Sequence, residues 1–338
     1  MKKLFFLYNR GKDKGKGGDD MAYYVGIDLG GTNIVAGVVD EGCQILAKAE
    51  TKTRAPRPAE EVCADMAAVY RQALAAAGLA EGEIAWIGVG SPGVIDKAAG
   101  RVELAANLGF QGAPVRQLLQ ALTGKPVYLD NDANAAAYGE FLAGVGRDAA
   151  SLVMITIGTG IGGGIILDGK IWSGFRYGGA ELGHMVIRSG GRPCTCGRVG
   201  CMEAYCSATG LIQTTREAME KSPDSLLWQV SGGLDGVSGR TAFRAADQGD
   251  AAAQAVLERY IDDFACGVAN VINLLQPEVI AIGGGISREG ERLVGPIRER
   301  ALKVVMSRHS PQNTRILPAA LGNDAGIIGA AFLGREGQ

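Results

Sequence analysis

Three cysteines and a histidine are spaced as the ligands of a single metal ion. Cys194, Cys196 and Cys201 fall within eight residues, and His184 lies ten residues before the first of them. Thiolates and imidazole together form tetrahedral structural zinc sites. Reduced thiols without a metal are the alternative, but three close cysteines with glycines between them disfavour it. The spacing therefore predicts a Cys3His zinc site, and such a site is typical of a reducing compartment, here the cytoplasm.

A second polar cluster follows an apolar strand. The stretch "VYLDNDANAAAYGE" places Asp130, Asn131, Asp132 and Asn134 between that strand and an alanine-rich helix. Asp130 still belongs to the strand, whereas Asp132 leads the helix. At that position an aspartate either caps the helix or accepts a proton as a general base. These residues alone leave both roles open.

Two glycine-rich segments match the pattern G-x-G-x-x-G, at Gly158–Gly163 and at Gly88–Gly93. A dinucleotide site requires those glycines to open a helix. Here the first segment runs into a strand-like stretch, and the second contains Pro92. The chain also lacks the motif G-x-x-x-x-G-K-[ST], so the sequence excludes both a dinucleotide site of this kind and a P-loop.

The remaining role for the glycine turns is a hairpin whose backbone amides bind phosphate. The alternative is a pair of turns that bind nothing, but two such turns at matching places favour a ligand. Aspartate in the first turn suits a metal ion or its bound water. The candidates are Asp28, Gly30, Gly31, Thr32 and Asn33 in "DLGGTN", and Gly158, Thr159 and Gly160 in "GTGIGGG".

These residues require an α/β scaffold in which one motif occurs twice. Apolar runs at 23–29 and 34–40 flank the first glycine turn, and runs at 151–157 and 161–167 flank the second. Residues 60–79, 134–142 and 248–276 have helical patterns. The repeat predicts duplicated mixed-sheet lobes with a cleft between them. We expect a flexible extension at 1–20, a small lobe at 21–129 that receives a C-terminal helix near 323–338, and a large lobe with the zinc loop at 130–322.

The composition excludes several classes of protein. The 338 residues carry a net charge of −2, which favours neither nucleic acid nor a membrane surface as a partner. No apolar run reaches the roughly 20 residues of a membrane span. The chain has 52 glycines, about twice the ordinary share, which is consistent with close approach of the backbone to a ligand.

The glycine motifs "DLGGTN", "GTGIGGG" and "IGGG" resemble the nucleotide-binding elements of the actin-like, hexokinase-type ATPase fold. The sequence "ELGH" followed by "CTCGRVGCMEA" resembles the signature of the ROK family of sugar kinases and sugar-responsive repressors. The resemblance extends from Tyr23 to about Gly334. It implies a two-lobed fold of this ATPase type, ATP with Mg²⁺ as co-substrate, and a structural Zn²⁺.

The resemblance also assigns roles to individual residues. It makes Asp132 the catalytic base and adds Gly284 and Gly285 to the nucleotide site. A zinc-held loop would project carboxylates into the cleft with fixed geometry, and His184 would then serve both metal and sugar. The implied sugar-binding residues are Gly93, Asn107, Asn131, Asp132, Glu181, His184 and Glu203.

The implied activity is phosphorylation of the 6-hydroxyl of a hexose, with glucose as the first expectation. A kinase for fructose, N-acetylglucosamine or N-acetylmannosamine is the main alternative, because one missing hydroxyl partner can change the preferred substrate. Polyphosphate is an alternative donor. A repressor of this family would carry a DNA-binding domain before "DLGGTN", where this chain has about two dozen residues. The resemblance implies a homodimer as the expected assembly.

Overall fold

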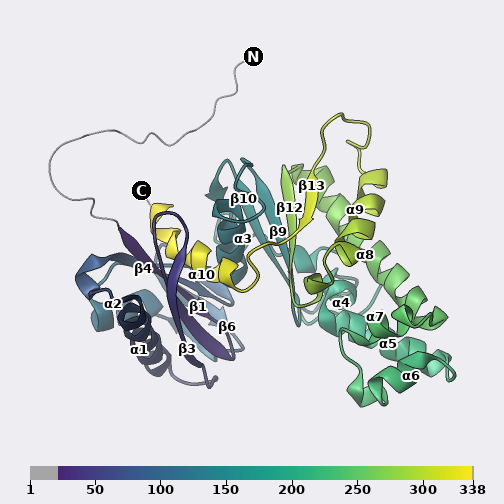
Figure 1. The fold of residues 1–338 in the computed structure, drawn as a ribbon, viewed down its shortest axis with the longest axis horizontal. Coiled ribbons are helices and arrows are strands. Elements are labelled where there is room, and N and C mark those ends of the chain that lie inside the picture. The colour runs from purple at the N-terminus through teal and green to yellow at the C-terminus, as the bar shows by residue number, and fades with distance from the viewer. Residues whose placement is uncertain (1–21, 337–338) are drawn as a thin grey trace.

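Two five-stranded mixed sheets, one in each lobe, form the frame of the protein (Figure 1). The computed structural model describes residues 22–336, so the extension predicted at 1–20 lies outside the described residues. The strand orders β3-β2-β1-β4-β8 and β11-β10-β9-β12-β13 repeat one pattern. In each sheet an antiparallel hairpin pairs with a third strand that runs parallel to its first member. The duplicated motif predicted from the sequence is thus present.

The first sheet is covered by helices on both faces. α1 lies on one face, against β2 and β3, and α10 lies against β1 and β4. A small three-stranded sheet, which the sequence reading missed, adjoins this lobe. The elements are β1 Tyr23–Leu29, β2 Asn33–Val39, β3 Ile45–Lys52, α1 Ala59–Ala77, β4 Ile84–Ser91, β5 Val94–Asp96, β6 Arg101–Ala105, β7 Phe110–Ala113, α2 Val115–Thr123 and β8 Val127–Asn131.

The second sheet has α3 on one face and the long helix α8 with α9 on the other. Successive side chains of β9 therefore point to opposite faces of the sheet. Val153 and Ile155 pack in the hydrophobic core with α8, whereas Leu152 and Met154 pack in the core with α3. The elements are α3 Asp132–Leu142, β9 Leu152–Ile157, β10 Ile161–Leu167, β11 Lys170–Ile171, α8 Ala251–Leu275, β12 Val279–Gly284, α9 Glu291–Val304 and β13 Arg315–Pro318.

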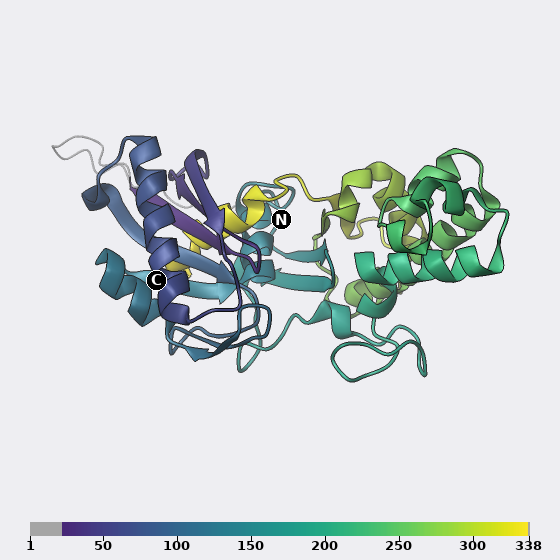
Figure 2. The same ribbon diagram turned by 90° about the horizontal axis from the view of Figure 1, so that it is seen from below.

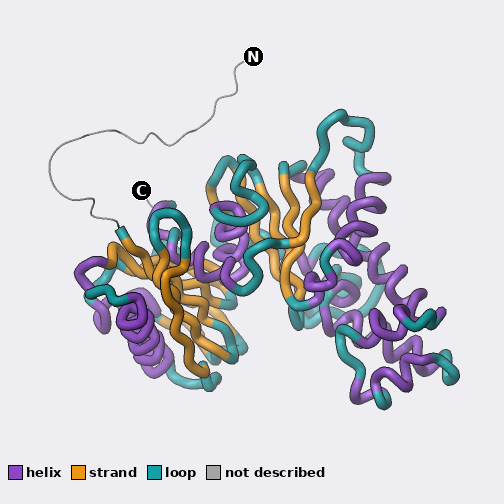
Figure 3. The backbone as a smooth tube through the Cα atoms, viewed as in Figure 1, coloured by secondary structure: helices purple, strands orange, loops and turns teal. Residues whose placement is uncertain are grey.

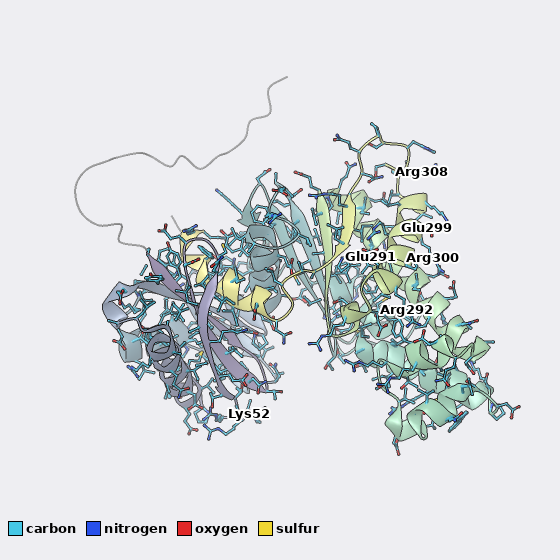
Figure 4. The ribbon with its side chains drawn as sticks, viewed as in Figure 1. Lys52, Glu291, Arg292, Glu299, Arg300 and Arg308 are labelled. Atoms are coloured by element: carbon cyan, nitrogen blue, oxygen red, sulfur yellow. The ribbon has the colours of Figure 1, made fainter. Side chains whose placement is uncertain are left out.

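Further helices extend the large lobe beyond this sheet (Figures 2 and 3). They are α4 Glu203–Cys206, α5 Ala208–Lys221, α6 Leu226–Ser231 and α7 Thr241–Asp247. α9 is joined to its neighbours by charged side chains labelled in Figure 4: Arg292 pairs with Asp247 of α7 at 2.6 Å, and Arg300 with Asp262 of α8 at 2.7 Å. None of the described helices is long and apolar enough to cross a membrane.

Helices α3 and α10 pack against each other between the two sheets (Figure 1). α10 spans Asp324–Ala331. α10 lies so close to α3 and to β1 that both contacts require glycine. A Cβ on Gly329 of α10 would lie 1.7 Å from the carbonyl oxygen of Ala135 in α3, and a Cβ on Gly26 of β1 would lie 1.8 Å from the carbonyl oxygen of Ile327 in α10. The chain therefore returns at its end to pack between the two sheets.

Candidate active site

The first glycine hairpin joins β1 to β2 and is braced from β3. The amide of Gly30 donates to the carbonyl of Asn33 at 2.9 Å, and the Thr53 hydroxyl donates to the carbonyl of Gly30 at 2.6 Å. Lys52, labelled in Figure 4, donates to Oδ1 of Asn33 at 2.8 Å. The Gly30 amide is therefore used within the turn. Asp28, Gly30, Gly31, Thr32 and Asn33 all line one cavity of about 690 Å³.

The second hairpin, between β9 and β10, is held by the start of α5. The Gly158 amide donates to the carbonyl of Gly160 at 2.9 Å, which closes the turn. The Thr209 hydroxyl donates to the carbonyl of Thr159 at 2.8 Å. β12 ends beside this turn, because Gly284 pairs with Ile157 in the parallel register.

Residues from both lobes line a single cavity of about 610 Å³. From the first lobe come Asp28 and Asn107, and from the helix between the sheets comes Asp132. The second hairpin contributes Gly158 and Gly160. This cavity shares Asp28 and Asn323 with the cavity of the first hairpin. The two glycine turns therefore border neighbouring spaces, as a bound chain of phosphate groups would require.

Two carboxylates face this cavity with raised pKa values. Burial raises the pKa of Asp28 to about 6, and the negative charge of Asp132 adds to the effect. Burial also raises the pKa of Asp132, although the amide of Ala133, 2.8 Å from its Oδ1, partly opposes this. Both pKa values indicate a site where a cation would offset unfavourable negative charge.

The capping role considered for Asp132 belongs to its neighbour. Oδ1 of Asn131 accepts from the amides of Ala133 at 2.9 Å and Asn134 at 3.4 Å, so Asn131 is the N-cap of α3. The Asn131 Nδ2 donates to the carbonyl of Gly93 at 3.0 Å. Asp132 is the first helical residue, and its carboxylate lines the cavity.

Asp130 has a structural environment distinct from that of Asp132. It is buried, with 1% of its surface exposed, and it forms an ion pair with Lys97. It also accepts from the Asn131 amide at 2.7 Å and from Nδ2 of Asn134 at 2.9 Å. Because its charge is paired within the protein, Asp130 is a poor candidate for proton transfer.

A smaller pocket of about 80 Å³ adjoins the cleft. Gly93, Asn131 and Asp132 line one side of it, and Tyr177 and Glu181 contribute from the loop after β11. Gly93 has a φ of 94°, and a Cβ there would lie 2.0 Å from the carbonyl oxygen of Leu104. The structure thus gathers four of the residues that the resemblance assigned to the sugar: Gly93, Asn131, Asp132 and Glu181.

The ligand atoms of His184, Cys194, Cys196 and Cys201 all lie within 4.8 Å of one another. The sulfur atoms of Cys196 and Cys201 are 3.7 Å apart, and Nδ1 of His184 is 3.6 Å from the sulfur of Cys194. A tetrahedron with metal–sulfur bonds of about 2.3 Å has edges of about 3.8 Å. The donor set and these two distances are therefore compatible with a zinc ion.

Glu203 connects this cluster to the second hairpin. Its Oε2 accepts from the Ile161 amide at 2.9 Å, and its Oε1 accepts from the Thr195 hydroxyl at 3.3 Å. The same carboxylate lines the large cavity. Glu203 thus lines the large cavity, and Glu181, whose carbonyl accepts from the His184 amide at 3.0 Å, lines the small pocket. His184 is among the lining residues of neither space and lies within the metal cluster.

Three residues of the site were missed from the sequence. Asn323 lines both cavities at the start of the final helix, Lys97 neutralises Asp130, and Tyr177 lines the small pocket. Lys97 and Asn323 reach the site through contacts between distant segments, which no local pattern encodes. The neighbouring glycines of Tyr177 are the one sequence signal that could have marked its loop.

A model of the ROK family matches residues 24–336. The chain belongs to the ROK family. The α/β class and the actin-like, hexokinase-type fold expected from the sequence are confirmed, since a solved ROK family glucokinase from Streptomyces griseus in complex with glucose and AMPPNP superimposes with a TM-score of 0.79. That protein is 33% identical, and the match covers 93% of this chain and 100% of the other.

Two other relatives bear on the substrate of this ROK protein. A glucokinase from Thermotoga maritima is 38% identical over 314 residues, which cover 92% of this chain and 97% of the relative. An N-acetyl-D-glucosamine kinase from Escherichia coli is 31% identical over 326 residues, which cover 92% of this chain and 98% of the relative. Family membership alone therefore spans hexose and N-acetylated hexose kinases.

Proposed function

We propose that this protein is an ATP-dependent kinase that transfers the γ-phosphoryl group to the 6-hydroxyl of glucose. One observation carries the proposal: a single cavity is lined by a carboxylate at a helix start, Asp132, by the glycine turn of β9 and β10, and by Glu203 beside the metal cluster. Phosphoryl transfer requires a cradle for the phosphates, a cation and a base for the hydroxyl, and this cavity offers candidates for all three. The glucokinase names of similar proteins support glucose as the acceptor.

The triphosphate would lie between the two hairpins. The first contributes Gly31, Thr32 and Asn33, and the second contributes the residues around Thr159. Asp28 would hold Mg²⁺ directly or through water, because a divalent cation reverses the burial penalty that raises its pKa. Gly284 and Gly285, at the end of β12, would contact the nucleotide beyond the phosphates.

The sugar would lie between the small pocket and the metal loop. Gly93, Asn107 and Asn131 would contact its hydroxyls from the first lobe. Glu181, which lines the small pocket, Glu203, which lines the large cavity, and His184 would contact them from the second lobe. Carboxylate and amide groups of this kind discriminate between sugars through paired hydrogen bonds.

Asp132 would accept the proton of the 6-hydroxyl as that oxygen attacks the γ-phosphorus. Burial raises the pKa of Asp132, so its carboxylate is a stronger base than that of a free aspartate. Its carboxylate begins α3 from a position fixed by the Asn131 cap. The proton leaves the hydroxyl, the bond from oxygen to phosphorus forms, and ADP departs.

A zinc ion bound by His184, Cys194, Cys196 and Cys201 would have a structural role. It would hold the loop that leads into α4, whose first residue is Glu203, and so would position that carboxylate without taking part in phosphoryl transfer. The pairwise distances of 3.6 and 3.7 Å support this assignment.

The direct test is a coupled assay of the purified protein with ATP, Mg²⁺ and a panel of sugars. The panel contains glucose, mannose, fructose, N-acetylglucosamine and N-acetylmannosamine. We expect the highest kcat/KM for glucose, and a product whose phosphate is attached at O6 by NMR. A higher kcat/KM for another sugar would reject glucose as the preferred substrate, and turnover with polyphosphate but not with ATP would reject the proposed donor.

A further inference from the structure

Tyr177 lines the small pocket from an uncommon backbone position. Its φ is 60°, in the left-handed region where residues other than glycine are rare. Phe175, two residues earlier, is 95% exposed. Tyr177 is half-buried and borders the pocket together with Asp132 and Glu181. The loop therefore presents one aromatic residue to the pocket and leaves the other in solvent.

The loop that carries Tyr177 is closed on itself. The Gly179 amide donates to the carbonyl of Ser173 at 2.8 Å, and the Tyr177 amide donates to that of Gly174 at 3.4 Å. Gly179 also lies against the ring of Trp172, since a Cβ there would be 2.9 Å from it. The short loop thus has an internally bonded base, which limits how far its tip can move.

The end of this loop is anchored in the core. Ala180 and Leu182 are 8% and 7% exposed and belong to the core of the second sheet. A Cβ on Gly163 of β10 would lie 2.3 Å from the carbonyl oxygen of Ala180, so this segment packs directly on the strand. A loop that is closed at its base and packed at its end therefore holds Tyr177 at the edge of the pocket.

The pocket that Tyr177 lines is small. Its volume is about 80 Å³, whereas the adjoining cleft holds about 610 Å³. A ligand that reaches Asp132 and Glu181 together must therefore fit against the ring of Tyr177.

We propose that Tyr177 is a specificity-determining residue whose ring packs against the hexose and excludes hexoses enlarged by an N-acetyl group. The inference rests on the proposed kinase function and extends it by naming the substrate class, hexoses without an acetamido substituent. The strained backbone agrees with such a role, because left-handed residues other than glycine cluster at ligand sites.

The test compares glucose with N-acetylglucosamine in wild type and in four variants. Tyr177→Gly and Tyr177→Asn remove the ring and suit a positive φ, and Tyr177→Phe keeps the ring. Phe175→Ala is the matched control, since it removes an exposed aromatic residue from the same loop. For each protein, the ratio of kcat/KM values and the ratio of Kd values measured calorimetrically without ATP are determined.

We expect Tyr177→Gly and Tyr177→Asn to shift both ratios toward N-acetylglucosamine by roughly 10- to 200-fold. Tyr177→Phe and Phe175→Ala should retain the wild-type ratios. Unchanged ratios in both ring-removing variants, or an equal shift in Phe175→Ala, would overturn the inference. The Kd ratios test the role of Tyr177 in sugar selection without requiring turnover. The kinase function is tested separately, because an absence of glucose phosphorylation by wild type would refute it.

Discussion

The side chain of Asn131 caps the helix that Asp132 begins. Oδ1 of Asn131 lies 2.9 Å from the amide of Ala133, and its Nδ2 lies 3.0 Å from the carbonyl oxygen of Gly93. One residue thus satisfies the helix start and ties it to the loop after β4. This division of roles leaves the Asp132 carboxylate to face the cleft, and it allows capping and chemistry to be tested separately.

Asn131→Ala should lower stability through loss of the cap. An N-cap replaced by alanine costs about 1 kcal/mol, which for a chain of this size lowers Tm by about 2 °C. Asn131→Ser is the matched control, because serine caps nearly as well and lacks the amide that reaches Gly93. Thermal unfolding should place the serine variant close to wild type. Equal loss in both variants would show that the bond to Gly93, and not the cap, supplies the stability.

Asp28→Asn should stabilise the ligand-free protein at neutral pH. The pKa of Asp28 is about 6 in the folded protein and about 4 in an unfolded chain. Between these values the folded state binds the extra proton, so stability falls as pH rises from about 4 to 6, and the loss is complete above that range. The substitution removes a penalty of up to about 3 kcal/mol at pH 7.5.

The measurement for Asp28 is the difference in Tm between variant and wild type at several pH values. That difference should be largest at pH 7.5 and should shrink as the pH falls below 6. Turnover with Mg²⁺ and ATP should fall in the same variant, since the carboxylate proposed to bind Mg²⁺ is lost. A difference in Tm that grows at lower pH would contradict the assigned sign.

Cys201→Ser should prevent binding of the proposed zinc ion. Cys201 is buried and lies 3.7 Å from the sulfur of Cys196, so its loss leaves an incomplete ligand set. Elemental analysis should find about one zinc per wild-type chain and much less in the variant. Weaker sugar binding should follow, because the loop that holds Glu203 loosens. Full activity in metal-free wild type would contradict a role for the metal.

The Cys63→Ser variant is the control for the zinc experiment. Cys63 is also buried, but it lies in α1 within the core of the first lobe. Its substitution should leave the zinc content unchanged. A similar loss of metal in Cys63→Ser would indicate that destabilisation, and not ligand loss, releases the ion.

The sequence predicted those parts of the site that local patterns encode. The hairpins around Gly30 and Gly158 follow from apolar runs on either side of a turn, and the metal cluster follows from the spacing of Cys194, Cys196 and Cys201. In these cases the residues that act together are close in the chain, so neighbouring sequence determines their arrangement.

The parts that the sequence did not predict were missed for different physical reasons. Asp and Asn cap helices about equally well, so propensity could not assign the cap of α3 to Asn131 over Asp132. The inward position of Tyr177 depends on a left-handed backbone angle that its packed loop imposes. The strands β5 to β7 are short, with three to five residues each, and short strands give little periodicity to read.

In the proposed reaction, Asp132 accepts the proton of the sugar hydroxyl. Asp132→Asn keeps the shape of the residue, and Asn131 still caps the helix, so Tm and glucose affinity should hardly change. Asp130→Asn is the comparison: it breaks a buried ion pair with Lys97, so its main effect should be a lower Tm.

The most direct measurement is kcat for glucose with ATP and Mg²⁺ in wild type and Asp132→Asn, under saturating substrates. Loss of a general base predicts a decrease of roughly 10²- to 10⁴-fold in a variant that unfolds at the wild-type temperature. Retention of more than about a tenth of the wild-type kcat would contradict this role for Asp132, because removal of a general base has a far larger effect.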